Sequence, residues 1–191
     1  MQLILASSSS YRKELLNRLR LDFSCDAPEI DETPLPGETP AQLVKRLALA
    51  KARKVAERHP NALIIGSDQA AVLGNNVLGK PHTEENAVKQ LQQASNKTLQ
   101  LMTGLCLLNS KTGEYQLEMV PYAVTLRDLS DRALASYVEK DRPLDCAGSF
   151  KWEQLGIALF SDMRGSDVTA LQGLPLIKLV DMLEAEGVSV L

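Results

Sequence analysis

The chain has 191 residues, is 45% hydrophobic and carries a net charge of −3, which fits one domain, or one domain of two lobes. A negative charge and only eight aromatic residues disfavour nucleic-acid binding, because phosphate backbones attract basic surfaces. Cys25, Cys106 and Cys146 are widely spaced and odd in number, so no disulfide framework is indicated and we expect a cytoplasmic protein. The N-terminal apolar stretch is too short for a signal peptide or membrane span, so no membrane association is expected.

The first third of the chain predicts a strand, a helix, an irregular loop and a second helix. Residues 2–6 (QLILA) read as a buried strand and residues 11–20 as a helix with leucines on one face. Residues 26–40 are proline-rich and acidic, which predicts a loop. Thr39, Pro40 and Gln42 then form a capping box with a proline at the first helical position. We expect most cations of the following helix to be solvated.

The rest of the chain alternates strands with helices. Residues 61–81 predict a strand and a hairpin turned at positions 74–76, and Thr83 caps the next helix. Two strands follow, over residues 99–109 and 115–129, and Ser130 caps a helix that runs to about residue 139. Residues 156–160 (GIALF) read as a last strand, and residues 173–187 as a closing helix ended by a glycine. The hairpins require a mixed sheet, so the fold class is α/β without strict doubly wound alternation.

Residues 5–16 (LASSSSYRKELL) place four serines and an arginine where a strand passes into a helix. Helix capping explains one serine, because its side-chain oxygen satisfies a free backbone N–H group. Several hydroxyls at a positive helix end, next to Arg12, also describe a phosphate-binding site. Both interpretations remain open at this point.

Carboxylates and lysines are the other candidates. Asp68 ends an apolar strand in IIGSDQ, Lys80 sits in a Gly–Lys–Pro turn, and Glu32 follows another acid in the proline-rich loop. Each also has an ordinary structural interpretation, as a turn residue or a solvated charge. Together they fit metal-assisted attack of water on a polyphosphate, since carboxylates hold a hard cation such as Mg²⁺. No Walker-type phosphate loop is present.

The motifs LASSSSYRKELL, IDETP, IIGSDQ, GKP, CAGSFKWEQLGIALF and GLPL occur in the order seen in the Maf family of nucleoside triphosphate pyrophosphatases, which the chain resembles from end to end. The resemblance implies a single Maf-like domain over residues 1–191, with a mixed curved sheet flanked by helices and a central cleft. It also implies cleavage between the α- and β-phosphates with a divalent cation (Mg, Mn or Co), and a possible homodimer. Within the family, the chain looks like the 7-methyl-GTP branch. Its opening departs from the family pattern, because Ser10 replaces a proline and Tyr11 replaces a tryptophan.

The resemblance also implies roles for individual residues. Asp68 would accept a proton from the attacking water and, with Glu32, hold the metal. The base would be read by Tyr11, Gln69 and Glu153, although Tyr11 could also pack on its helix and Glu153 could be a solvated acid. The triphosphate would be bound by a larger set: Ser7, Ser9, Arg12, Lys51 and Lys80.

Two rival functions remain. One is hydrolysis of dTTP, UTP or another non-standard nucleotide by the same fold. The other is a nucleotide-sensing regulator of septation that does not turn its ligand over. Retention of Asp68, Lys51 and Lys80 argues against the second, because a sensor does not require a base.

Overall fold

The computed structural model describes residues 1–191 and divides them into two compact units. The first unit contains Met1–Gln69, Met102–Val120 and Asp167–Leu191, and the second contains Ala70–Leu101 and Pro121–Ser166. Seven strands form one mixed sheet in the order β2-β1-β3-β5-β6-β7, with β4 paired to β3. The α/β class with a mixed sheet, expected from the sequence, is confirmed. In chain order the elements are β1 (Gln2–Ala6), α1 (Ser10–Asn17), β2 (Ser24–Cys25), α2 (Pro40–Ala56), β3 (Ala62–Leu73), β4 (Asn76–Leu78), α3 (Glu84–Ala94), β5 (Thr98–Asn109), β6 (Tyr115–Leu126), α4 (Asp131–Asp141), η1 (Leu155–Leu159), β7 (Phe160–Gly165), η2 (Val168–Gln172) and α5 (Leu176–Ala185).

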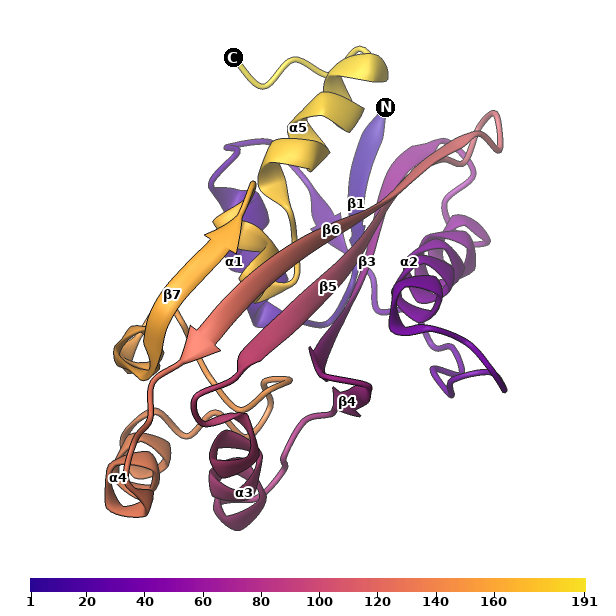
Figure 1. Ribbon diagram of the computed structural model, residues 1–191. Helices are drawn as coiled ribbons and strands as arrows, with labels where there is room; N and C mark the ends of the chain where they lie inside the picture. The colour runs from indigo at the N-terminus through magenta and orange to yellow at the C-terminus, as the bar shows by residue number, and fades with distance from the viewer. The chain divides into compact units, whose positions relative to one another are not determined.

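In the first unit the sheet is covered on both faces. Strand β1 pairs in parallel with β2 and β3, and alternate side chains of β1 and β3 enter two separate cores. One core holds Leu5 and Ile65 against α1 and α5, and the other holds Ile4 and Ile64 against α2. Figure 1 shows α2 on one side of the strands and α1 with α5 on the other. Strand β1 ends at Ala6, opposite Gly66 of β3, and α1 begins four residues later.

Helix α2 packs directly on the strand backbones because glycines face it. A Cβ atom at Gly66 would meet the carbonyl of Ala48, and one at Gly104 would meet the carbonyl of Val44. The start of the helix is fixed by the predicted capping box between Thr39 and the third helical residue. This close approach brings the buried face of α2 next to the middle of β3. The prediction that Asp68 ends its strand is wrong, because β3 continues through Asp68 to Leu73.

The second unit joins two helices to the remaining strand segments. Helices α3 and α4 pack against each other, and β7 runs antiparallel to β6. The rings of Phe150 and Phe160 meet edge to face with centroids 5.0 Å apart. The buried Ser149 hydroxyl donates to Gln90 Oε1 at 2.6 Å, which ties the loop after α4 to α3.

Most predicted elements are present, but the strand expected at residues 156–160 is wrong. Residues 155–159 form a 3₁₀ turn instead, and the strand begins at Phe160. The amide of Gly156 donates to Asp141 Oδ2, and a Cβ at Gly156 would meet the carbonyl of Lys151. These contacts bend the backbone, so its apolar residues do not extend as a strand. Helix α1 also ends at Asn17, three residues before the predicted end.

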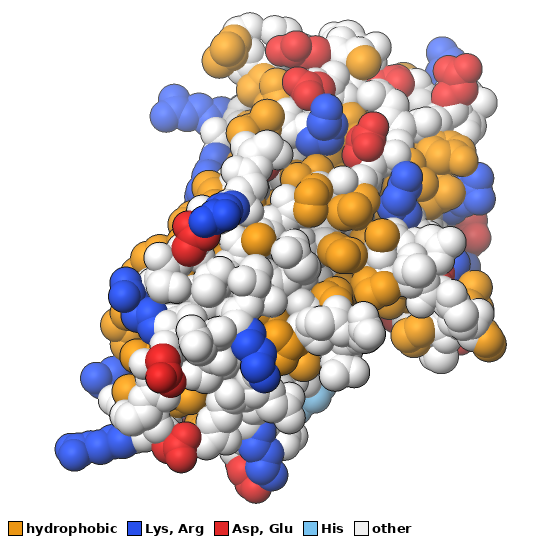
Figure 2. All heavy atoms as spheres, viewed as in Figure 1, with side chains coloured by type: hydrophobic (Ala, Val, Ile, Leu, Met, Phe, Trp, Pro, Cys, Tyr) orange, Lys and Arg blue, Asp and Glu red, His pale blue; other side chains and the backbone are white.

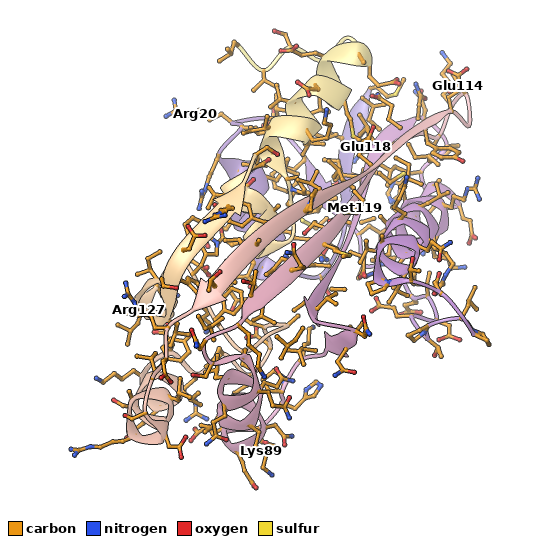
Figure 3. The ribbon with its side chains drawn as sticks, viewed as in Figure 1. Arg20, Lys89, Glu114, Glu118, Met119 and Arg127 are labelled. Atoms are coloured by element: carbon orange, nitrogen blue, oxygen red, sulfur yellow. The ribbon has the colours of Figure 1, made fainter.

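The surface carries both signs of charge. In Figure 2 basic and acidic side chains are interspersed on the visible face without a large field of one sign. Figure 3 places Glu114 at the turn between β5 and β6, and Arg127 just after β6. No helix is both long enough and apolar enough to cross a bilayer.

Candidate active site

The serine-rich junction between β1 and α1 forms a set of hydrogen bonds around Arg12. Ser9 is the N-cap of α1, and its Oγ accepts from the backbone N–H of Arg12 at 3.4 Å. Ser7 Oγ accepts from the Ser9 amide at 3.1 Å and from Arg12 Nη1 at 3.4 Å. The capping interpretation therefore holds for Ser9, while Ser7 lies buried beside the guanidinium.

Arg12 is oriented by a residue near the other end of the chain. Its Nε donates to the carbonyl of Gly173 at 2.8 Å, and its side chain is half-buried. Burial lowers the pKa of Arg12, whereas the nearby charges of Asp68 and Glu32 raise it. An arginine titrates far above neutral pH, so the group stays cationic. A guanidinium carries several N–H donors in one plane, which suits it to an anion such as a phosphate.

Asp68, Lys51 and Glu32 form a compact charged cluster. Lys51 Nζ lies 2.6 Å from Asp68 Oδ1 and 2.8 Å from Glu32 Oε1. Lys51 is 5% exposed and Asp68 is 9% exposed, whereas the Glu32 side chain is 57% exposed. Most cations of α2 were expected to be solvated, and Lys51, to which the family resemblance gave a role, is buried. The cluster supplies an anchored carboxylate next to a fixed cation.

The two carboxylates suit a hard divalent cation. No group of three or more histidine, cysteine or acidic side chains gathers anywhere in the protein. Asp68 and Glu32 nevertheless both contact one atom, Lys51 Nζ. Mg²⁺ is usually held by one or two carboxylates, with water and phosphate oxygens completing its shell. These donors therefore fit a cation that is shared with a phosphate ligand.

The 3₁₀ turn η2 and the Gly173 that follows it support the same region from the other face of the sheet. The Ser67 hydroxyl lies 2.8 Å from the Gly104 carbonyl and 2.7 Å from the Gly173 carbonyl, so its single proton is shared between two acceptors. The Gly173 carbonyl thus contacts both Ser67 and Arg12. The position of the guanidinium depends on this turn.

The same turn fixes the side chain of Gln69. Gln69 Nε2 donates to the Ala170 carbonyl at 2.6 Å and to Thr103 Oγ1 at 3.2 Å. The Thr103 hydroxyl in turn donates to the Ala170 carbonyl at 2.9 Å. A backbone carbonyl only accepts, so the amide cannot be reversed without placing two acceptors together. Gln69 therefore offers only Oε1, an acceptor, to any further partner.

Asp167 builds the turn itself. Its Oδ1 accepts from the backbone N–H and the hydroxyl of Thr169, and its Oδ2 accepts from the Ile177 amide at 2.8 Å. The Thr169 hydroxyl also lies 2.8 Å from the Leu176 amide, which donates to it. Sequence reasoning did not find Asp167, although an aspartate before a short apolar turn is a common capping signal.

The remaining predicted residues lie elsewhere. Tyr11 is half-buried in the first turn of α1, next to Arg12 in sequence. Lys80 and Glu153 belong to the second unit, where Lys80 is exposed before α3 and Glu153 is half-buried before η1. The structure thus brings together six predicted residues, and the roles assigned to all ten stay predictions. The six are Ser7, Ser9, Arg12, Glu32, Lys51 and Asp68.

Comparison with known proteins assigns the family. The family model described as Maf-like protein matches residues 2–186. The chain belongs to the Maf family. Proteins named 7-methyl-GTP pyrophosphatase match it at 57% identity in Pseudomonas savastanoi pv. phaseolicola and 55% in Pseudomonas aeruginosa, each over 98% of both chains. One from Methylobacillus flagellatus is 55% identical over 99% of this chain and 98% of its own.

A solved structure gives a more distant likeness for this Maf-family chain. The Staphylococcus aureus Ham1 protein superposes with a TM-score of 0.55, covering 97% of this chain and 100% of its own, at 17% sequence identity. At that identity the likeness shows a shared fold.

Proposed function

We propose that this chain hydrolyses nucleoside triphosphates to a monophosphate and pyrophosphate, and that 7-methyl-GTP is its preferred substrate. The observation that carries the proposal is the charged cluster of buried Asp68 and Lys51 with the exposed Glu32, beside Arg12 at the start of a helix. Relatives that are 55–57% identical over nearly their whole length are named 7-methyl-GTP pyrophosphatases, which supports this substrate.

The phosphates would lie at the junction between β1 and α1. Arg12 and the hydroxyls of Ser7 and Ser9 supply a cation and hydrogen-bond donors at a positive helix end. We propose that Lys51, and Lys80 from the second unit, add further positive charge. These groups stabilise negative charge that develops on phosphoryl oxygens.

We propose that Asp68 accepts a proton from the attacking water. Its carboxylate is anchored at Oδ1 by Lys51, which leaves Oδ2 as the basic oxygen. A divalent cation (Mg, Mn or Co) held by Asp68 and Glu32 would supply charge neutralisation to the leaving pyrophosphate. General-base catalysis contributes about 10²–10⁴-fold to the rate. Asp68→Asn should therefore lose about that much activity.

We propose that Tyr11, Gln69 and Glu153 read the base. Methylation at N7 gives guanine a positive charge, and a cationic ring stacks favourably on an aromatic face such as that of Tyr11. Guanine also presents adjacent N–H donors. The acceptor Oε1 of Gln69 and the carboxylate of Glu153 are chemically matched to such donors.

A nucleotide panel tests this function. Purified protein with Mg²⁺ or Mn²⁺ is assayed for pyrophosphate release from 7-methyl-GTP, GTP, UTP and dTTP, with Asp68→Asn as the control for contaminating hydrolases. The highest kcat/KM is expected for 7-methyl-GTP. Preference for dTTP or UTP would favour the other branch of the family, and tight binding without pyrophosphate would favour a sensor. Tyr11→Ala and Glu153→Ala should each lower the preference for 7-methyl-GTP while the metal requirement stays.

We also propose a cytoplasmic location and a homodimer. The exposed Cys25 thiol and the buried Cys106 thiol support a reducing compartment. Fractionation of cells and the molar mass of the purified protein in solution test these two points.

A further inference from the structure

The ammonium group of Lys51 lies between the two carboxylates that suit a metal. Its Nζ is 2.6 Å from Asp68 and 2.8 Å from Glu32, and the side chain is only 7% exposed. Lys51 emerges from the buried face of α2, where the close packing at Gly66 holds the helix against β3. The close packing at Gly66 therefore fixes the backbone from which the ammonium reaches the two carboxylates.

The charges of this cluster balance without a metal. Asp68 and Glu32 carry two negative charges, and Lys51 and Arg12 carry two positive charges, with Arg12 electrostatically coupled to both acids. The nearby Arg46 pairs with Glu38 and is also attracted by Asp31. A free divalent cation would therefore enter a neutral cluster and meet an ammonium close to the oxygens it needs.

A metal–triphosphate complex differs from the free cation in the sign of its net charge. It carries a net negative charge, because a triphosphate has more negative charge than one divalent cation removes. The Arg12 guanidinium can donate hydrogen bonds to such an anion, and Lys51 can pair with a phosphate oxygen while the carboxylates contact the cation. Each carboxylate then contacts a cation, and each phosphate oxygen contacts a cationic group, so like charges are kept apart.

We propose that Lys51 makes metal binding depend on the triphosphate, so that the cation enters as part of a metal–triphosphate complex and not ahead of it. This inference takes the triphosphate from the proposed function. It adds that the buried lysine excludes the metal from the unliganded protein.

Binding of Mn²⁺ to the ligand-free protein tests the inference directly. Free Mn²⁺ is measured by electron paramagnetic resonance during titration of the wild type, Lys51→Met, Lys51→Arg and Lys54→Met. We expect Lys51→Met to bind Mn²⁺ at least about tenfold more tightly than the wild type, because one positive charge is removed next to the cation. Lys51→Arg should bind as weakly as the wild type. Lys54→Met is the matched control on the same helix, since Lys54 pairs with Glu57 outside the cluster.

Two further measurements locate the effect. The increase in Mn²⁺ affinity caused by Lys51→Met should disappear in the double variant Lys51→Met/Glu32→Gln, which also lacks one carboxylate of the site. Calorimetry with inorganic tripolyphosphate should show tighter binding to the wild type when Mg²⁺ is present than when it is absent. Circular dichroism checks the fold, and Lys51→Gln replaces Lys51→Met if that variant does not fold.

Equal Mn²⁺ affinity of the wild type and Lys51→Met would overturn the inference. The inference would also be overturned if the double variant kept the increased Mn²⁺ affinity. It would equally be overturned if Mg²⁺ did not strengthen the binding of tripolyphosphate to the wild type. None of these measurements needs turnover or a nucleobase, so their failure is distinguishable from failure of the nucleotide panel.

Discussion

Replacing Gly173 by alanine should separate the role of Arg12 from the stability of the fold. Gly173 has φ +86°, a conformation in which an L-residue costs about 1–2 kcal/mol. For a domain of this size, that cost lowers Tm by roughly 2–8 °C. An added Cβ would also lie 3.1 Å from Arg12 Nε and 3.2 Å from Nη2, closer than ordinary van der Waals contact. The guanidinium must therefore shift, and its 2.8 Å hydrogen bond to the Gly173 carbonyl must lengthen.

A displaced guanidinium should reduce activity more than the lost stability explains. A misplacement of about 1 Å in a catalytic site can cost about 10²-fold, and the smaller shift expected here should lower kcat/KM by about 10-fold or more. The assay is pyrophosphate release from 7-methyl-GTP at a temperature well below both Tm values. KM should rise, since Arg12 is predicted to bind the phosphates.

Gly187→Ala is the matched control. Gly187 has φ +76° in the same unit, but nothing lies within 4 Å of an added Cβ. This variant should lose a similar amount of Tm and keep kcat/KM within about twofold, because it strains the backbone without touching Arg12. Equal losses of kcat/KM in the two variants would refute the argument, as would full activity of Gly173→Ala.

Three further variants test other parts of the structure. Lys80→Ala should lower kcat/KM by about 10–100-fold for every nucleotide alike, as expected for loss of a charge-assisted contact to phosphate, and a change in base preference would contradict that role. Thr103→Val removes the hydroxyl that helps to orient Gln69, so the preference for guanine nucleotides over UTP should fall about fivefold, whereas Thr103→Ser should keep it. Asp26 accepts hydrogen bonds from Arg58 and contacts His59, which lower its pKa from 3.8 to about 2, so its stabilising effect is present above pH 3.8 and is lost as pH falls through that range. The Tm difference between the wild type and Asp26→Asn, measured by calorimetry, should therefore be largest near neutral pH and disappear near pH 2.

Local signals predicted the fold well. The capping residues Ser9, Thr39, Thr83 and Ser130 each accept a hydrogen bond from an amide three residues later, and this contact depends on neighbours in the chain. The strand predicted at residues 156–160 failed because a short apolar run does not distinguish a strand from a turn. Its conformation is set by a hydrogen bond to Asp141, fifteen residues away in sequence.

The candidate site was predictable only in part. Asp68 could be proposed from its motif and Lys51 from the family resemblance, and the structure places them in contact. The roles of the Ala170 and Gly173 carbonyl groups could not be predicted. Every residue has a backbone carbonyl, so the sequence does not mark these two, and their partners are far away in the chain. The acceptor-only orientation of Gln69 follows from those carbonyls, so it becomes visible only in three dimensions.

The hydrogen bond between Arg12 and Gly173 joins positions 161 residues apart, and the one between Ser67 and Gly173 spans 106. During synthesis the amino-terminal strand and helix leave the ribosome long before their partner does. A nascent chain that has already formed α1 therefore cannot yet hold the Arg12 guanidinium in place. Contacts of such long range also close late and slowly in folding, because the entropy of a large loop must be overcome first. Catalytic competence should consequently appear as one of the last events of biogenesis, after residue 173 has docked.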